Sequence, residues 1–211
     1  MSELDQIAAE VKVCQRCPLA GGRTNAVPGE GPPDAEIMFI GEGPGFHEDR
    51  QGRPFVGASG KLLEDLLASI GMTRDQVFIA NVVKCRPPNN RDPLPAEIEA
   101  CTPYLDRQEE VLDPRIVVTL GRFSMQRYFP GQSITRIHGQ VKRKENTAYV
   151  PMFHPAAALR NPQWMTEIRS DFAKLPALLA DLRIAKAAAT PIALQQPAAP
   201  PPDDFEQLTL F

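Results

Sequence analysis

The sequence lacks any apolar run close to the roughly 18 residues that a membrane-spanning helix needs. Its N-terminus carries acidic side chains, whereas a secretory signal begins with basic ones and continues with an apolar stretch. We therefore expect a cytoplasmic protein. Neither sign of charge dominates, because the 211 residues carry a formal net charge of -3. That balance argues against a protein that coats nucleic acid by charge alone, although a local basic patch could still bind a phosphate backbone.

Cysteine is scarce, since the chain has only four: Cys14, Cys17, Cys85 and Cys101. An even set that includes one C-x-x-C motif is more typical of a metal centre than of disulfides. Zinc and a [4Fe-4S] cluster both accept four thiolates, and the spacing does not choose between them. A redox pair of the thioredoxin type lies at a strand-to-helix junction, whereas Cys14 ends an expected N-terminal helix. That third option is therefore disfavoured.

Large side chains are few in residues 187–204, and no charged residue precedes Asp203 there. Residues 187–204 read AAATPIALQQPAAPPPDD. This segment has too few large side chains to offset the entropy cost of ordering its backbone. Proline, at 22 of 211 residues, is about twice as frequent as the usual ~5%, and part of that excess lies here. We expect one folded domain over residues 1–186 and a disordered tail over residues 187–211.

Upstream of that tail, short apolar runs alternate with amphipathic segments. The apolar runs predict strands buried on both faces, at residues 36–42, 77–84, 115–121 and 148–155. The amphipathic segments predict helices at residues 57–72, 94–112, 121–129 and 161–187. This alternation indicates a three-layer α/β/α domain with a central four-stranded parallel sheet. Chemistry in such sheets lies at the carboxyl ends of the strands, which brings together residues 41–45, residues 81–86, Gly121 and His154.

A glycine-rich stretch follows the first predicted strand and reads GEGPGFHEDRQGRPFVGASGKLL. A glycine-rich turn between a strand and a helix can hold phosphate. The nucleotide-binding pattern G-x-x-x-x-G-K-[ST] is nevertheless absent, because Lys61 is followed by Leu62. Three carboxylates, Glu42, Glu48 and Asp49, would also repel a triphosphate. A nucleotide site is therefore disfavoured at this loop.

The order GE-x-PG, ED and G-x-PFVG in this stretch closely resembles the first motif of family 4 uracil-DNA glycosylases. The resemblance continues in the family's order through NVVKCRPPNNRDP, VTLGRFS and VPMFHPAAALRNP, and it covers roughly Cys14 to Pro162. It implies the uracil-DNA glycosylase fold and a [4Fe-4S] cluster on Cys14, Cys17, Cys85 and Cys101. It also implies hydrolysis of the bond between uracil and deoxyribose in DNA, which releases uracil and leaves an abasic site.

This resemblance gives the residues of the carboxyl edge specific roles. Uracil must leave the base stack and enter a pocket that reads its Watson-Crick edge. Phe55 would stack on the base, with Gly43 in the pocket wall. Asn81 offers an acceptor for uracil N3-H and a donor for O4, whereas cytosine presents the opposite pattern. His154 would donate to uracil O2, where charge collects as the bond breaks.

The three carboxylates of the glycine-rich loop receive separate roles by the same resemblance. Glu42 is the first candidate for orienting water and stabilising the oxocarbenium-like sugar, and Asp49 is the second. Glu48 would lie beside uracil C5 and crowd the methyl group of thymine.

Basic residues near the predicted active edge are candidates for contacts with the DNA backbone. Arg160, just past the histidine motif, could enter the minor groove or contact a phosphate. The other candidates are Lys84, Arg86 and Arg91 near one strand end and Arg136, Lys142, Arg143 and Lys144 around the sequence ITRIHGQVKRK.

A related branch of the superfamily, which becomes covalently trapped on uracil-DNA, carries a basic insert with a histidine after the second strand. Here Lys84 runs directly into Cys85, and His138 lies much later. We therefore predict ordinary turnover by a monomer. Two other readings stay open: a non-catalytic uracil or DNA binder of the same fold, and a zinc-stabilised nucleotide hydrolase.

The chain ends in an apolar peptide, Gln207, Leu208, Thr209, Leu210 and Phe211. It resembles the peptide by which bacterial repair and replication proteins dock on the sliding clamp, since apolar anchors on a flexible segment suit a preformed groove. A flexible linker of about 20 residues spans roughly 25 Å and gives an effective concentration of order mM. The resemblance thus implies a sliding clamp as partner and action near the nucleoid.

Overall fold

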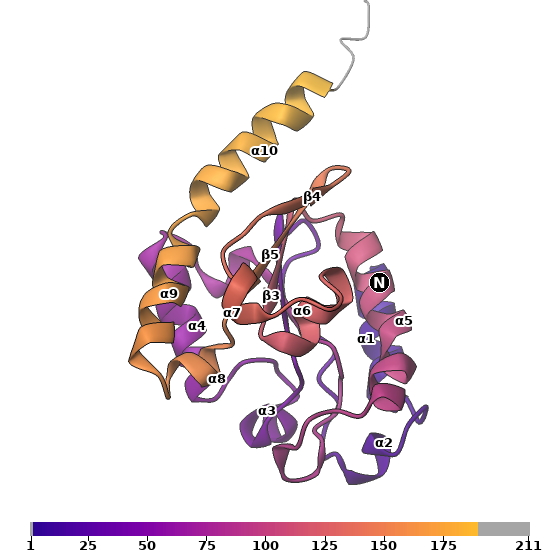
Figure 1. The fold of residues 1–211 in the computed structure, drawn as a ribbon. Helices are drawn as coiled ribbons and strands as arrows, with labels where there is room; N and C mark the ends of the chain where they lie inside the picture. The colour runs from indigo at the N-terminus through magenta and orange to yellow at the C-terminus, as the bar shows by residue number, and fades with distance from the viewer. Residues whose placement is uncertain (1, 190–211) are drawn as a thin grey trace, which may run out of the picture.

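The computed structural model describes residues 2–189, whose helices and strands alternate along the chain (Figure 1). The strands are β1 Ile37–Gly41, β2 Phe78–Asn81, β3 Ile116–Leu120, β4 Lys142–Lys144 and β5 Thr147–Met152. The helices are α1 Glu3–Val13, α2 Leu19–Gly22, α3 Phe46–Gln51, α4 Ala58–Ser69, α5 Pro95–Leu112, α6 Arg122–Tyr128, α7 Ile134–Ile137, α8 Pro155–Ala158, α9 Pro162–Phe172 and α10 Leu175–Ala189, with short 3₁₀ turns at Arg74–Gln76 and Pro88–Asn90.

The strands form one sheet in the order β2-β1-β3-β5-β4. β1, β2, β3 and β5 run parallel, whereas β4 pairs antiparallel with the outer edge of β5. The four predicted strands are confirmed, and β4 adds an antiparallel fifth strand to the predicted sheet. Its three residues are charged and exposed. They therefore lack the apolar pattern by which the other strands were predicted.

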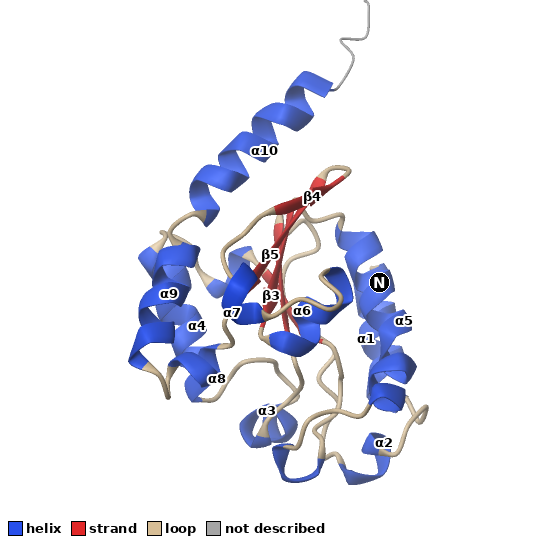
Figure 2. Ribbon diagram, in the orientation of Figure 1, coloured by secondary structure: helices blue, strands red, loops and turns tan. Residues whose placement is uncertain are grey.

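Helices cover both faces of the sheet and form the predicted three layers (Figure 2). Side chains alternate along β1, so that Ile37 and Phe39 pack with α4, α9 and α10 while Met38 and Ile40 pack with α5. α1 lies beside α5 on that second face (Figure 1). Because both faces are covered, β1, β2 and β3 are buried along their whole length.

The long helix predicted at residues 161–187 is two helices, α9 and α10, which are separated after Phe172. Pro176 lies in the first turn of α10, where a helix needs no backbone N–H from it. Inside a continuous helix, the missing N–H of proline would remove a backbone hydrogen bond. α10 continues to Ala189, past the predicted domain end at residue 186. The rest of the predicted linker and the peptide Gln207 to Phe211 lie outside the described residues.

Within residues 2–189, no helix has the length and apolar character that crossing a membrane requires. The order of the strands reverses at β1, because β2 lies on one side of it and β3 on the other. Open parallel sheets bind ligands outside the carboxyl ends of their strands at such a point. In Figure 1 this end of the sheet lies at the bottom, toward α3.

Candidate active site

A pocket of about 460 Å³ lies at the carboxyl edge of the sheet. Its walls come from the loop after β1, the end of β2, the turn that follows β2 and the segment after β5. The lining residues are Glu42, Gly43, Pro44, Gly45, Glu48, Phe55, Ser59, Asn81, Pro87, Asn90, Arg91, His154, Ala156, Ala157 and Arg160. The fold thus brings together the predicted pocket residues Glu42, Gly43, Glu48, Phe55, Asn81 and His154.

Asn81 is the last residue of β2 and is 1% exposed. Neither its Oδ1 nor its Nδ2 has a hydrogen-bond partner among the described residues. Buried polar side chains in folded proteins are almost always paired, so an unpaired amide on a pocket wall is a place for a ligand. Asn81 can offer one acceptor and two donors to such a ligand.

Gly41 makes room for this amide and was not among the predicted pocket residues. It pairs with Asn81 across the sheet, and a Cβ there would lie 2.4 Å from Asn81 Oδ1 and 2.7 Å from Phe55 Cζ. Any larger residue would therefore displace both side chains. A glycine at a strand end is a recognised sign of such close approach, so the sequence did contain an indication of it.

Phe55 is held in the pocket wall by its backbone as well as by packing. It is 5% exposed and adopts φ +52°, a left-handed conformation that non-glycine residues seldom take. Arg74 fixes the strained segment, because its guanidinium donates to the backbone oxygen of Phe55 at 2.8 Å and to that of Pro54. Gly60 lets α4 approach closely, since a Cβ there would clash with the Phe55 carbonyl.

His154 faces Phe55, with the ring centroids 5.7 Å apart and the planes 24° from parallel. Its Nδ1 accepts a hydrogen bond from the Ala156 backbone N–H at 3.1 Å, which leaves the proton of the neutral ring on Nε2. Burial lowers the pKa of His154 to about 4, although the charge of Glu48 opposes the shift. At neutral pH the side chain is therefore an uncharged hydrogen-bond donor.

The two carboxylates that line the pocket, those of Glu42 and Glu48, have different surroundings. Burial raises the pKa of Glu42 above its ordinary value of 4.5, with a further rise from Asp92 and an opposing effect of Arg122. Glu48 accepts backbone N–H bonds from Val56 and Gly57 at 2.9 Å and from Gly45 at 3.1 Å. Glu48 thus ties the two sides of the glycine-rich loop together.

Asp49, the second candidate for the catalytic acid, does not line the pocket. It is 4% exposed, and its Oδ1 accepts from the backbone N–H groups of Thr24 at 2.8 Å and Asn25 at 3.4 Å. The side chain fixes the segment after α2 against α3. Its catalytic role stays a prediction, which this geometry does not favour because the carboxylate lies outside the pocket lining and is already bonded.

The sequence is similar to a family model and to several known proteins. A model of the uracil DNA glycosylase superfamily matches residues 28–182. The chain belongs to the uracil-DNA glycosylase superfamily. It is 54% identical over 185 residues to a type-4 uracil-DNA glycosylase of Sulfurisphaera tokodaii, covering 83% of this chain and 84% of that protein. Proteins of the same name from Archaeoglobus fulgidus and Saccharolobus solfataricus are 48% and 50% identical, covering 83% of this chain and 92% and 86% of theirs.

Three of the arginines predicted to contact DNA lie at or beside the pocket. Arg91 and Arg160 line the pocket, and Arg86 Nε donates to Asn90 Oδ1 at 2.7 Å beside it. Arg91 also forms a two-point ion pair with Glu97, at 2.9 and 2.7 Å. All three arginines therefore lie at or beside the pocket, and their contact with DNA stays a prediction.

Lys84 does not face DNA, contrary to the prediction. It is 1% exposed, and its Nζ donates to Gln108 Oε1 at 2.6 Å. Gln108 in turn donates to the Pro28 backbone oxygen at 2.8 Å. The side chain therefore belongs to a buried network under α5, out of reach of a phosphate.

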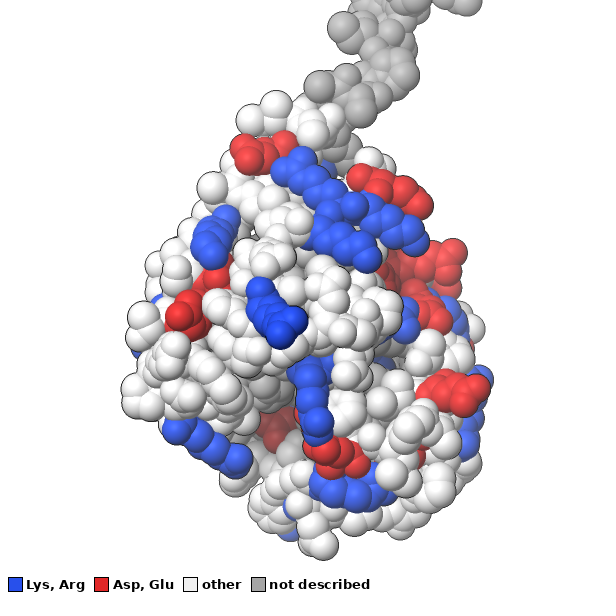
Figure 3. Space-filling model, viewed as in Figure 1, with Lys and Arg blue, Asp and Glu red and all other residues white. Residues whose placement is uncertain are grey.

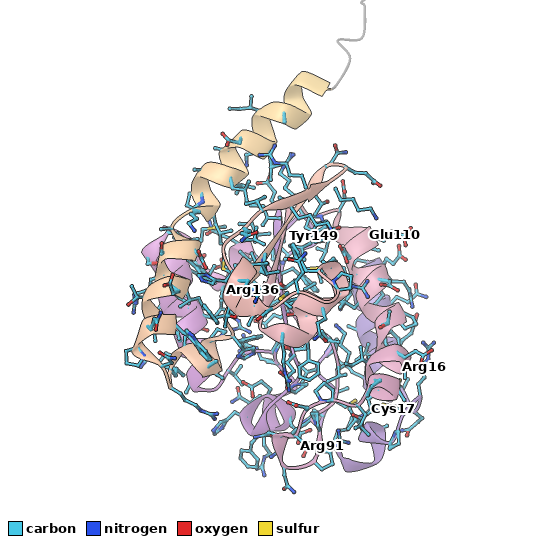
Figure 4. All side chains as sticks on the ribbon, viewed as in Figure 1. Arg16, Cys17, Arg91, Glu110, Arg136 and Tyr149 are labelled. Carbon is cyan, nitrogen blue, oxygen red and sulfur yellow. The ribbon has the colours of Figure 1, made fainter. Side chains whose placement is uncertain are left out.

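The basic stretch Lys142 to Lys144 is also in a different place from the one predicted. It forms β4, whose antiparallel course carries it toward Thr147 at the start of β5, the end of the sheet remote from the pocket. Lysine and arginine side chains gather over this upper end of the molecule (Figure 3). Arg136, on α7, is exposed and lies well away from Arg91 (Figure 4).

The four cysteines come together beside α1 and α5. Cys85 and Cys101 are buried in one apolar cluster, with Cys14 and Cys17 packed against it, and Figure 4 shows Cys17 beside Arg16 near the lower part of α5. N–H groups point at three of the sulfurs: Arg23 Nη1 at 3.2 Å from Cys85 Sγ, the Lys84 backbone at 3.4 Å from Cys101 Sγ and the Arg16 backbone at 3.5 Å from Cys14 Sγ.

Such N–H donors favour the thiolate form that metal centres require. The four cysteines thus lie in one region with donors that suit thiolates, although burial raises the pKa of Cys85 and raises that of Cys101 to about 11. Within residues 2–189, however, no three Cys, His, Asp or Glu side chains are grouped closely enough to be a preformed ion site.

Proposed function

We propose that this chain hydrolyses the N-glycosidic bond of deoxyuridine in DNA, releasing uracil and leaving an abasic site for base excision repair. The observation that carries the proposal is the unpaired amide of Asn81 at the pocket wall. Its acceptor matches uracil N3-H and its donor matches O4, whereas cytosine would leave both without partners. A site built to hydrogen-bond one pattern rejects the other strongly.

The neutral His154 supports the same reaction. As the bond from the sugar C1′ to uracil N1 breaks, its electrons move into the base and charge builds on O2. The Nε2–H of His154 donates to that oxygen, and a preformed donor stabilises the developing anion because it needs no reorganisation. Phe55 packs against the face of the base and holds it in line.

Glu42 supplies the remaining group of the mechanism. Its carboxylate lines the same pocket and stabilises the positive charge of the sugar. It orients a water molecule toward C1′ and accepts the proton that the water loses. Glu48 is bonded to three backbone N–H groups, so its part is to shape the wall beside uracil C5.

The cysteine cluster supports a [4Fe-4S] centre on Cys14, Cys17, Cys85 and Cys101. Such a centre would cross-link α1, α5 and the segment after β2, which follows directly from Asn81 at the end of that strand. Anaerobically purified protein should be brown and absorb at about 400 nm, as thiolate-bound iron does. A colourless protein that holds zinc would contradict the iron-sulfur assignment.

The C-terminal peptide supports a second contact, with a bacterial sliding clamp. Leu208, Leu210 and Phe211 are apolar anchors of the kind that a preformed groove binds. Surface plasmon resonance should detect binding of the full chain to an immobilised clamp. The double substitution Leu210→Ala and Phe211→Ala should abolish this binding. Equal binding of both proteins would exclude this contact.

The reaction is tested with a labelled oligonucleotide that contains one deoxyuridine, beside a matched thymidine control. Treatment with alkali converts an abasic site into a strand break. We expect cleavage at uracil only, with strong loss in Asn81→Ala and His154→Ala and retention in a surface control, Val141→Ala. Tight uracil-dependent binding without cleavage would contradict the enzymatic function and indicate a non-catalytic binding protein of the same fold.

A further inference from the structure

Phe46 is an exposed aromatic side chain at the rim of the pocket. It is the first residue of α3 and follows directly after Gly45, which lines the pocket. Its exposed fraction is 50%, although a large apolar side chain at the start of a helix could have packed inward. Single exposed apolar residues are common on protein surfaces, so exposure alone does not indicate a function.

The surroundings of Phe46 set it apart from an ordinary exposed residue. The Arg86 guanidinium lies 5.2 Å from the centre of its ring and that of Arg50 lies 6.0 Å away. No carboxylate of the described residues forms an ion pair with either arginine. An aromatic ring with two arginines that keep their charge available is the combination by which proteins bind unpaired nucleotides.

The position of this group is fixed relative to the pocket. Arg86 precedes Pro87, which lines the pocket, and its Nε is bonded to Asn90, which also lines it. The loop that leads to Phe46 packs on the segment that leads to Arg86, because a Cβ on Gly43 would lie 2.7 Å from Val83 Cγ2. The ring and the guanidinium therefore come from two segments that are held together beside the base site.

We propose that Phe46, Arg50 and Arg86 bind the nucleotide adjacent to the extruded deoxyuridine, with its base stacked on Phe46 and its phosphate contacted by the arginines. This inference rests on the proposed glycosylase function and adds a preference to it. A neighbouring base can stack on Phe46 only if it leaves its own helical stack. The enzyme should therefore favour deoxyuridine in single-stranded or locally unpaired DNA.

The test combines changes in the protein with the removal of single bases from the substrate. Single-stranded oligonucleotides with one deoxyuridine carry a normal base or an abasic analogue immediately 5′ or immediately 3′ of it. For wild-type protein, kcat/KM should fall about 5- to 50-fold when the stacking neighbour is removed, as expected for one base-aromatic contact. Phe46→Leu should lose a similar factor on the intact substrate and then be insensitive to the missing base.

Three further variants separate stacking from other effects. Phe46→Trp should retain both the rate and the sensitivity, because it keeps an aromatic face. Val141→Ala removes an equally exposed apolar side chain, 45% exposed on the chain between α7 and β4, and should behave as wild type. Arg86→Gln should reduce the salt dependence of binding, as the loss of a phosphate contact does.

The outcomes distinguish this inference from the proposed function. If Phe46→Leu and wild type respond equally to a missing neighbour, the stacking role is wrong while uracil release stands. The same protein and substrate combinations measured as binding, by fluorescence anisotropy, report the stacking even where no uracil is released. If no uracil is released but the affinity for DNA still depends on both Phe46 and the neighbouring base, only the glycosylase proposal is contradicted.

Discussion

Two histidines lie near the carboxyl end of β5 and differ in what surrounds them. His138 Nδ1 lies 2.7 Å from Asp171 Oδ2, and the other oxygen of Asp171 accepts from Lys174 at 2.8 Å. His154 has a backbone N–H on Nδ1 and no bonded carboxylate among the described residues. Folding alone completes the hydrogen bonds of the first group. The pocket around His154 and Asn81 instead keeps the Asn81 amide without hydrogen-bond partners among the described residues.

The largest expected effect separates these two histidines. His154→Ala should lower the rate of uracil release about 10²- to 10³-fold, because it removes a donor to the charge that develops on the base. Its melting temperature should fall modestly, because the change also removes the acceptor that caps α8 at the Ala156 N–H. His138→Ala should retain the rate and lose stability by about 1 to 3 kcal/mol, since it removes a partner of buried Asp171.

Single-turnover kinetics and thermal unfolding measure these two effects separately. The contrast between the histidines fails if His138→Ala loses activity while it stays folded, or if His154→Ala retains the full rate.

Asn81→Leu tests whether the unpaired amide is kept for a ligand. Activity should fall by about 10²-fold or more, because the Watson-Crick edge of uracil loses both partners. The free energy of unfolding should stay the same or rise by up to about 1 kcal/mol, because the change removes two buried atoms without partners. Denaturant unfolding beside the activity assay measures both. A loss of stability would mean that water or another group satisfies the amide in the free protein.

The pH profile should identify Glu42 as the group that limits activity in acid. The reaction needs the Glu42 carboxylate, whose pKa is raised above 4.5, whereas His154 stays neutral down to about 4. As pH falls, activity should therefore decline through the raised pKa of Glu42, before His154 takes up a proton. The rate of uracil release measured from pH 4 to 8 should show one such limb, absent from the low residual activity of Glu42→Gln. Persistence of the limb in that variant would assign it to another group.

A smaller effect is expected from Arg74, which lies outside the pocket lining. Arg74→Lys keeps the charge near Glu30 but cannot make the fork of bonds to the carbonyl groups of Pro54 and Phe55. The strained Phe55 should become less well fixed, so KM should rise several-fold with a smaller change in kcat. Steady-state kinetics measure this split, and Arg53→Lys, on the same Glu30, is the matched control.

The smallest effects concern the basic residues on the two ends of the sheet. Arg160→Gln, at the pocket, should raise KM a few-fold and lower its salt dependence. Arg143→Gln, on β4, should change neither. Steady-state assays at several salt concentrations compare the two, and an equal loss in both variants would show that DNA extends over the upper end of the molecule.

The sequence predicted the layers, the parallel strands and the members of the pocket because each leaves a local pattern. Buried parallel strands are apolar throughout, and the residues after them must meet at one edge. The burial of Lys84 and Asp49 was not predicted, because burial is decided by partners that lie far away in the sequence. Lys84 bonds to Gln108, which bonds to the Pro28 backbone oxygen, and Asp49 accepts a hydrogen bond from the backbone of Thr24. Arg74 lies far from Phe55 in the sequence, and no local pattern indicates their contact.

The β4 strand has a consequence for how the molecule behaves at high concentration. An open edge of a sheet presents unpaired N–H and C=O groups to which another chain can add a strand. On the β2 side, Glu30 forms a bridge with Ile79 and occupies part of that edge. On the other side, the exposed strand consists of Lys142, Arg143 and Lys144. Two protein copies that approached each other along β4 would bring six positive charges together. The repulsion between these charges keeps further strands from adding to the sheet and so opposes aggregation.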